Sequence, residues 1–488
     1  MSVSKSYINA PLVNLLKKLS AQSSIPFHTP GHKKGQGISP SLASWLGTKV
    51  FQADLPELPE LDNLFAPEGV IKSAQDLAAS TFGAEQTWFL VNGSTCGVMA
   101  AIVATCRAGD KIILPRNIHQ SAIAGLIASG AIPIFVNPEY NPNLDLAYSV
   151  TPETVAQALR NHPDAKAVMV VYPTYHGICG NLVEIAKITH DYHIPLLVDE
   201  AHGAHFAFHS DLPISALEAG ADVAIQSTHK VLGAMTQASM LHLQGNRVNS
   251  QRISKALQLF QSTSPNYLLL ASLDAAREQI ASQGEELMAK TLKLATEGRK
   301  RIQSIPGLTV LESRNVCEPG FFAWDATRIT VFMQQLDIDG FRADEILHQE
   351  LGVTAELPLL NHLMFIVTFG NSSADIDKLV VALTNIAQKH YQPDASSSHG
   401  NPMPSNCSDC VLSPRDAFFA PSEALPLKEA VNRISAELVC PYPPGIPVLM
   451  PGELITVEAV EYLQAVIAAG GMVTGAGDSS LATLQVVS

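Results

Sequence analysis

Between about residues 68 and 245 the sequence alternates short, unbroken apolar runs with segments of helical character. Unbroken apolar runs are typical of strands buried on both faces, and helices between them imply parallel strand pairing. We therefore predict an α/β fold in which a mostly parallel, seven-stranded sheet lies between helices. The predicted strands are Thr87–Val91, Lys111–Leu114, Ile132–Val136, Ala167–Val171, Pro195–Val198, Gly220–Ile225 and Ala238–Leu243.

The length of 488 residues is too great for a single hydrophobic core, so we predict several domains. Residues 1–55 are expected to form an N-terminal helix and arm, and residues 56–305 a large domain that contains the sheet. Residues 306–392 are expected to form a small α+β domain. Ser, Pro and Asn are frequent in residues 393–410, which predicts a linker, and residues 411–488 are expected to form a C-terminal domain.

The composition narrows the class of partner. Hydrophobic residues make up 47% of the chain and charged residues 16%, as in a well-buried globular protein. The formal net charge of −14 argues against nucleic acid and anionic membranes as partners, whereas a small cationic substrate suits it. No apolar run reaches the roughly 20 residues of a membrane span, so we expect a cytoplasmic protein.

The cysteines are dispersed along the chain, which predicts reduced thiols rather than a disulfide framework. Cys407 and Cys410 form a lone Cys-x-x-Cys pair within the expected linker. A zinc site needs a second pair of ligands nearby, and none is evident. An incidental pair of loop cysteines is therefore the favoured interpretation.

Two groups of histidines have spacings that resemble metal sites. His28 and His32 lie four residues apart, but the Pro-Gly pair between them disfavours the helix that would put both on one face. A second group follows an apolar run that ends in a carboxylate, without a paired carboxylate motif beside it. We predict no metal site for this second group either, which consists of His202, His205 and His209.

Two chemically active residues each close an apolar run. Asp199 ends one run and Lys230 ends the next, 230 − 199 = 31 residues further on. Pyridoxal 5'-phosphate (PLP) needs a lysine that holds its aldehyde as a Schiff base, an acid that keeps its ring nitrogen protonated, and donors for its phosphate. The pattern therefore predicts a PLP site. A surface lysine and a salt-bridged aspartate are the alternatives that remain.

The turn after the first predicted strand offers a phosphate site. Ser94, Thr95 and Cys96 open an Ala-rich helix, whose first backbone N–H groups and positive dipole end favour an anion. An ordinary N-cap is the alternative, because Ser and Thr are frequent there. His119 follows the second predicted strand, where open sheets of this type bind ligands, and is either a ring that stacks on the cofactor or a structural histidine.

Motifs are distributed over nearly the whole chain, at Phe27–Gly35, Glu57–Leu64, Asp199–His205, Ser227–Lys230, Ser264–Tyr267, Pro441–Pro447 and Pro451–Glu453. Together they resemble the Orn/Lys/Arg decarboxylase family, PLP enzymes of the aspartate aminotransferase fold (fold type I). The proline-rich motif near residue 444 is specific, because few families need four prolines there. The chain is similar to the short branch that lacks an N-terminal receiver-like wing, and within it to bacterial biosynthetic arginine decarboxylases.

The resemblance implies roles for individual residues. Lys230 would carry the cofactor aldehyde, Asp199 would pair with the ring nitrogen and His119 would stack on the ring. The expected catalytic residues are Lys230, His229, Asp199 and His119. Further cofactor ligands are expected at Ser94, Thr95, Cys96, His202 and Ser227, and, from a neighbouring subunit, at Thr263 and Ser264.

Three details of this assignment are specific to the chain. Cys96 departs from the family pattern, in which Gly or Ala is more usual, and should be tolerated because the backbone N–H binds the phosphate. Glu437 and His28 are the expected contacts of the substrate. Lys230 and His229 both remain candidates for the group that returns a proton to Cα.

The implied activity is decarboxylation of a basic L-amino acid, with arginine favoured and agmatine and CO2 as products, in polyamine biosynthesis. Lysine and ornithine are the alternative substrates. An aminotransferase or an aldolase would keep the fold and change the reaction, and a catalytically silent regulator that binds PLP or polyamine would be a different class. The resemblance also implies a homodimer or higher homo-oligomer with shared active sites.

Overall fold

The computed structural model describes residues 9–312, 318–393, 410–442, 445–468 and 470–488. The linker predicted at 393–410 lies almost entirely outside these residues, and so does Cys407. Among the described residues, none of the helices is both long and apolar enough to cross a membrane. The predicted domain limits stay predictions.

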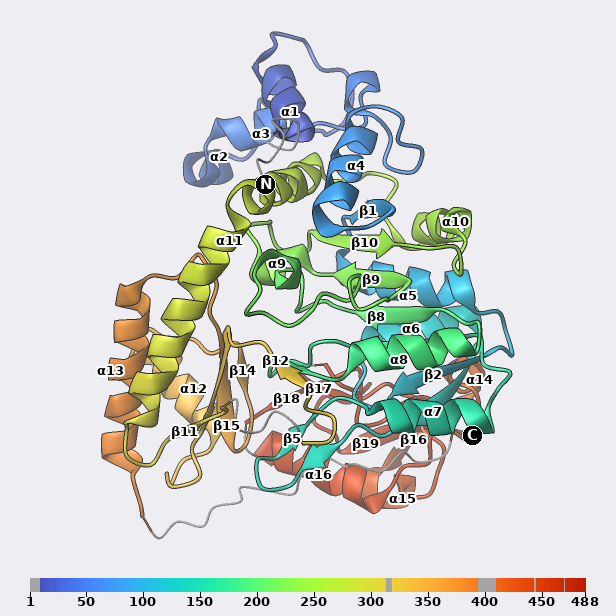
Figure 1. Ribbon diagram of the computed structural model, residues 1–488, viewed down its shortest axis with the longest axis vertical. Coiled ribbons are helices and arrows are strands. Elements are labelled where there is room, and N and C mark those ends of the chain that lie inside the picture. Colours follow the sequence, from blue (N-terminus) through green and yellow to red (C-terminus); the bar gives the residue numbers. More distant parts are fainter. Residues whose placement is uncertain (1–8, 313–317, 394–409, 443–444, 469) are drawn as a thin grey trace.

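A seven-stranded sheet forms the centre of the chain, with the order β1-β10-β9-β8-β6-β2-β3 (Figure 1). Strand β10 runs antiparallel to both of its neighbours, and the other pairs are parallel. The predicted α/β fold with a mostly parallel sheet is therefore confirmed. The strands are β1 (Gln86–Leu90), β2 (Lys111–Pro115), β3 (Ile132–Val136), β6 (Ala167–Val171), β8 (Leu196–Asp199), β9 (Val223–Gln226) and β10 (Ser239–Leu243).

Helices cover both faces of this sheet, which explains the unbroken apolar runs. Along β1, Phe89 packs into one core and its neighbour Leu90 into a second core on the other face. Because successive strand residues point to opposite faces, a sheet covered on both sides needs apolar residues at every position. The helices on the first face include α4 (Val70–Phe82), α7 (Pro152–Asn161) and α8 (Leu182–Asp191), and on the second α5 (Gly93–Thr105), α6 (Gln120–Ser129) and α10 (Ser250–Phe260).

A four-stranded antiparallel sheet forms a second unit, with the order β11-β13-β15-β14 and a core of its own. The long helix α11 (Tyr267–Gln303) begins beside the main sheet and ends beside α13 in this unit (Figure 1). Its first turn is capped by Asn266, whose side chain accepts from two backbone N–H groups. The other elements are β11 (Thr309–Val310), β13 (Arg328–Phe332), β14 (Leu357–Pro358), β15 (His362–Ile366), α12 (Gly340–Gln349) and α13 (Ser373–His390).

The two ends of the chain form separate structures at opposite ends of the long axis in Figure 1. The N-terminal elements are α1 (Pro11–Ala21), α2 (Pro40–Leu46), α3 (Thr48–Ala53) and η1 (Pro59–Leu61). The C-terminal unit has its own apolar core. It contains α14 (Pro414–Phe419), β16 (Ser422–Pro426), α15 (Leu427–Ala430), β17 (Cys440–Tyr442), α16 (Val457–Ala468), β18 (Met472–Thr474) and β19 (Thr483–Val487).

Short elements connect these units. Strand β12 pairs antiparallel with β7, so the chain that leads into the second unit is hydrogen-bonded to a loop of the first. The short elements are β4 (Tyr140–Asn141), β5 (Leu146–Ala147), β7 (Ile178–Cys179), η2 (Phe206–Phe208), α9 (Thr228–Val231) and β12 (Ala323–Trp324).

Candidate active site

A pocket lies where the parallel strands of the main sheet end, the position at which open α/β sheets bind ligands. Strand β6 contributes its last residue, Val171, and strand β8 contributes Asp199. The polar and aromatic side chains that line the pocket include Ser94, His119, Tyr175, Asp199, His202 and Lys230. Of the residues predicted from the sequence, five therefore meet in one place.

Lys230 lies in the short helix α9, directly after strand β9. Its Nζ atom is 2.9 Å from Nε2 of His202 and 5.4 Å from the centre of the Tyr175 ring. Burial lowers the pKa of the Lys230 amine, and the nearby charge of Arg328 acts in the same direction, while Asp199 and Glu356 oppose them. The site therefore makes the neutral amine, which is the nucleophilic form, easier to reach than it is for a lysine in water.

Asp199 is the last residue of β8 and is 5% exposed. One carboxylate oxygen accepts a hydrogen bond from the Ala201 backbone N–H at 3.2 Å. Burial raises the pKa of this carboxyl, and the charge of Lys230 opposes that rise. A buried carboxylate is stabilised by a cationic partner, which the protonated ring nitrogen of a pyridine ligand would supply.

The first turn of α5 presents backbone donors next to hydroxyl groups. No side chain caps this helix, so its first N–H groups are left for a ligand. The Ser227 hydroxyl lies 2.7 Å from the Ser94 hydroxyl, and Thr95 is exposed at the same helix end. Cys96 is buried and its thiol donates to the Gly93 carbonyl, and burial raises the pKa of the thiol to about 12. Cys96 therefore stays an uncharged thiol.

The two predicted catalytic histidines are held differently. His119 caps α6, and its Nδ1 atom accepts from the Ser121 backbone N–H at 3.2 Å. Burial lowers the pKa of His119 to about 4, with the charge of Lys230 as a second cause, so the ring that lines the pocket is neutral. His229 instead donates from Nδ1 to the Ala238 carbonyl at 2.9 Å and is not among the residues that line the pocket.

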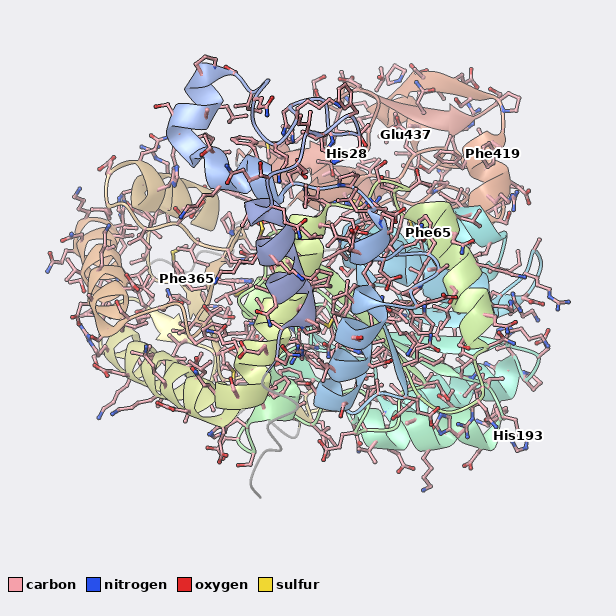
Figure 2. The ribbon with its side chains drawn as sticks, turned by 90° about the horizontal axis from the view of Figure 1, so that it is seen from above. His28, Phe65, His193, Phe365, Phe419 and Glu437 are labelled. Atoms are coloured by element: carbon pink, nitrogen blue, oxygen red, sulfur yellow. The ribbon has the colours of Figure 1, made fainter. Side chains whose placement is uncertain are left out.

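Besides Thr95, Cys96, Ser227 and His229, four predicted residues are not among those that line the pocket of the same chain. Thr263 and Ser264 are exposed in the segment before α11. Glu437 accepts backbone hydrogen bonds on both oxygens, from Gly477 at 2.6 Å and from Gln485 at 2.9 Å, within the C-terminal unit. His28 lies in the N-terminal arm. Figure 2 labels His28 and Glu437 in a view from above, along the long axis of Figure 1, and Figure 1 shows that the N-terminal arm and the C-terminal unit lie at opposite ends of that axis. The substrate-binding roles of Glu437 and His28 stay predictions.

The proline-rich motif brings the C-terminal unit to the pocket. Ile446 lines the pocket, and the Gly445 carbonyl accepts from the Gln120 backbone N–H at 3.2 Å. Arg116 donates to the carbonyls of Pro447 and Val448 at 2.7 and 3.1 Å, and to the Glu453 carboxylate at 3.1 Å. Arg116 therefore fastens the motif beside His119. In the sequence, the only signal for Arg116 was its position directly after an apolar run.

Replacing Arg116 by methionine is expected to lower the free energy of unfolding by roughly 3–5 kcal/mol, because it leaves a buried carboxylate without its partner. The side chains of Arg116 and Glu453 are 11% and 1% exposed. Denaturant unfolding measures the loss. Arg415→Met is the matched control, since Arg415 contacts α6 through the Ala128 carbonyl from an exposed position, and it should cost about 0.5 kcal/mol or less. Equal losses in the two variants would contradict this account of the docked motif.

Two further residues at the site had no direct signal in the sequence. Tyr175 packs its ring 4.3 Å from the ring of His202, measured between centroids. Arg328, the first residue of β13, is fully buried and donates to the His202 carbonyl at 3.0 Å. Both lie far from Lys230 along the chain. Tyr175 follows β6 of the main sheet, and Arg328 reaches the site only because the second sheet packs against the first.

The fold is shared with known enzymes. A lysine decarboxylase from Francisella novicida superposes with a TM-score of 0.84 at 22% identity, over 99% of this chain and 81% of that one. An alanine–glyoxylate aminotransferase from Nostoc superposes with a TM-score of 0.52 at 18% identity, over 65% of this chain and 88% of that one. The fold is thus one that decarboxylases and aminotransferases share.

The sequence comparisons narrow this class. Residues 10–330 match the profile of the Orn/Lys/Arg decarboxylase major domain, and residues 402–475 match that of its C-terminal domain. The arginine decarboxylase of Bacillus subtilis is 41% identical over 98% of this chain and 97% of that protein. The chain therefore belongs to the Orn/Lys/Arg decarboxylase family, whose members are in general PLP-dependent. The predicted family is confirmed.

Proposed function

We propose that this chain is a PLP-dependent decarboxylase that converts L-arginine to agmatine and CO2, a step of polyamine biosynthesis. The observation that carries the proposal is the meeting of Lys230, Asp199 and His119 in one pocket of a chain that belongs to this family. The sequence comparisons support arginine: the Bacillus subtilis relative is 41% identical, whereas a Pseudomonas aeruginosa lysine decarboxylase is 25% identical over 91% of this chain and 74% of that protein.

The residues present fit PLP at each of its functional groups. Lys230 supplies a buried amine for the aldehyde, and Asp199 supplies a buried carboxylate for the protonated ring nitrogen. The uncapped N-terminus of α5 and the Ser94 and Ser227 hydroxyls suit the phosphate. His119 offers an uncharged ring that faces the pocket.

When bound, PLP supplies an electron sink for the electrons released as CO2 leaves. Asp199 would hold the proton on the ring nitrogen and thereby keep that sink effective. His119 would offer its ring to the cofactor without adding a charge. The proline-rich motif, fastened by Arg116, covers the pocket with Ile446 and helps to exclude water.

We assign the return of the proton to Cα to Lys230 rather than to His229. Lys230 reaches into the pocket and lies within hydrogen-bond distance of His202. His229 has one ring nitrogen engaged by the Ala238 carbonyl and does not line the pocket. A proton donor must come within hydrogen-bond reach of the atom that it protonates, and this requirement favours Lys230.

We further propose that two copies of the chain share their active sites. Thr263 and Ser264 lie outside their own pocket and are exposed, as residues that reach a neighbouring phosphate must be. The N-terminal arm exposes large apolar side chains, among them Phe27 at 92% and Trp45 at 79%, which suits burial against a second copy. A cytoplasmic location is supported by the free, buried thiols of Cys96, Cys106, Cys179 and Cys440, because such thiols persist in reducing compartments.

We expect kcat/KM for L-arginine to exceed the values for L-lysine and L-ornithine by about 10- to 200-fold. An enzyme can distinguish substrates to this extent when their side chains differ in size or in hydrogen bonding. The release of CO2 from each amino acid measures this preference. Protein in which Lys230 is replaced by alanine serves as the blank. A preference for lysine or ornithine would overturn the choice of substrate, and no release from any of the three would favour the silent regulator.

A further inference from the structure

A buried series of charged and polar groups connects the second sheet to Lys230. Nε2 of His205 lies 3.2 Å from Oδ2 of Asp325, and the same oxygen lies 3.3 Å from Nε of Arg328. Nη2 of Arg328 lies 3.0 Å from the carbonyl oxygen of His202 and 3.4 Å from its Nδ1 atom. Nε2 of His202 then lies 2.9 Å from Nζ of Lys230. Apart from Lys230, each of these side chains belongs to a buried residue.

The series crosses the junction between the two sheets. Asp325 follows β12 and Arg328 opens β13, whereas His202 and His205 lie in the loop after β8 of the main sheet. Asp325 is anchored by its backbone N–H, which donates to the Gly177 carbonyl at 2.8 Å. The guanidinium is therefore held in place from the second unit and aimed at a histidine of the first.

The chemistry of the groups fixes where the protons lie. A guanidinium has only donors, so Nδ1 of His202 must be an acceptor where Arg328 donates to it. A neutral imidazole carries one N–H, which is then on Nε2 and points to Nζ of Lys230. An ammonium group has no lone pair and cannot accept this bond. In this arrangement of the protons, Nζ of Lys230 accepts the bond as a neutral amine.

We propose that Arg328 is a positioning residue that fixes the Nε2-protonated tautomer of His202 and thereby keeps Lys230 as a neutral amine. The neutral form is the one that can attack an aldehyde, so Arg328 prepares Lys230 for cofactor capture from the second unit. This inference rests on the proposed function of Lys230. It adds a residue that is not among those lining the pocket and that acts on the amine through His202, in addition to the effect of its own charge.

Several other groups around Lys230 favour its ammonium form, so the neutral amine needs a group that stabilises it. Asp199 and Glu356 favour the ammonium form, and so does the Tyr175 ring, because a cation is attracted to its face. Burial is the largest influence that lowers the pKa of Lys230, and the charge of Arg328 adds to it. The titratable or charged groups that influence the amine or face it are Asp199, His119, Tyr175, His202, His229, Arg328 and Glu356.

The test measures the titration of the Lys230 amine without relying on turnover. The full-length protein, freed of bound cofactor, is acetylated with a trace of acetic anhydride over a series of pH values, and mass spectrometry follows the peptide that contains Lys230. In Arg328→Lys, which keeps the positive charge but loses the forked donor, the midpoint should rise by about one pH unit. That rise corresponds to roughly tenfold less neutral amine at a given pH below the midpoint.

Two comparisons separate this role from a merely structural one. Arg299→Lys is the matched control, because Arg299 lies at the same junction but donates to the carbonyls of Ala326 and Arg328 instead of to His202. In Arg299→Lys the midpoint of the Lys230 titration should not move. In a His202→Asn background the imidazole N–H that faces Nζ is gone, so Arg328→Lys should add no further shift. An unchanged midpoint in Arg328→Lys, or an equal shift in the His202→Asn background, overturns the proposal.

A second measurement needs no folded Arg328 variant. The nitrogen-15 chemical shifts of His202 in the wild-type protein, assigned by their loss in His202→Asn, show which ring nitrogen carries the proton. A proton on Nε2 supports the proposal, and a proton on Nδ1 overturns it. If the proton is on Nε2 but PLP and borohydride do not label Lys230, the proposed function fails while the tautomer stands. If Lys230 is labelled and the proton is on Nδ1, only the inference about Arg328 fails.

Discussion

Lys230→Ala is expected to abolish decarboxylation, with a loss of at least about 10³-fold. The variant lacks both the amine that holds the cofactor and the group that we assign to proton return, and an acid–base group by itself contributes about 10²–10⁴-fold. In the wild-type protein, borohydride treatment in the presence of PLP should attach the cofactor to the peptide that contains Lys230. In the variant neither this label nor the release of CO2 from arginine should be detected.

A surface lysine provides the control for this experiment. Lys72 lies on α4, where its exposed amine pairs with Asp76 one helical turn away. Lys72→Ala should keep full activity and full labelling at Lys230. Normal turnover in Lys230→Ala, or a borohydride label on another side chain of the wild-type protein, would end the assignment of Lys230.

Asp199→Asn is expected to lower kcat by about 10²–10³-fold, with a much smaller change in KM. Asparagine has the same shape but no charge, so it cannot hold a proton on the ring nitrogen, and the loss of one preorganised electrostatic partner typically costs this much. Steady-state kinetics with arginine measures the effect. Borohydride labelling of Lys230 should continue, because the lysine that carries the cofactor is still present.

Asp222→Asn is the matched control for this second prediction. Asp222 is also a buried aspartate of the main sheet, but it lies before β9, at the opposite end of the strands, where it bonds to His190 and Arg247. Its replacement should reduce stability and leave kcat nearly unchanged. If Asp222→Asn lowers kcat as strongly as Asp199→Asn does, the effect of Asp199→Asn reflects damage to the fold and not its place at the ring nitrogen.

The main sheet could be predicted because its strands are recorded locally in the sequence. Leu196, Leu197 and Val198 are each fully buried, in one core or in the other, so the run had to be apolar throughout. Asp199 and Lys230 could be placed at one edge because each follows such a run, and parallel strands bring their carboxyl ends together. The antiparallel direction of β10 could not be predicted, because its apolar run reads the same in either direction.

The details of the site depended on contacts between distant parts of the chain. Arg328 meets His202 across 126 residues of sequence, and Arg116 meets Glu453 across 337. Nothing near Arg328 or Arg116 in the sequence names these partners. Glu437 shows the same limit: its position before the proline-rich motif predicts a substrate contact, which stays a prediction, and only the tertiary structure brings its oxygens to the backbone N–H groups of Gly477 and Gln485.

Neighbouring residues are enough to predict the layered α/β fold, the strand ends at which Asp199 and Lys230 lie, and the motifs that mark the family, because periodicity and short motifs are local properties of a chain. Contacts between distant segments set which side chains surround the amine of Lys230, how the C-terminal unit is held against the pocket, and which nitrogen of His202 faces the amine. These features arise where two sheets and a C-terminal unit pack together, and the geometry of that packing sets the hydrogen bonds on which the protonation of the site depends.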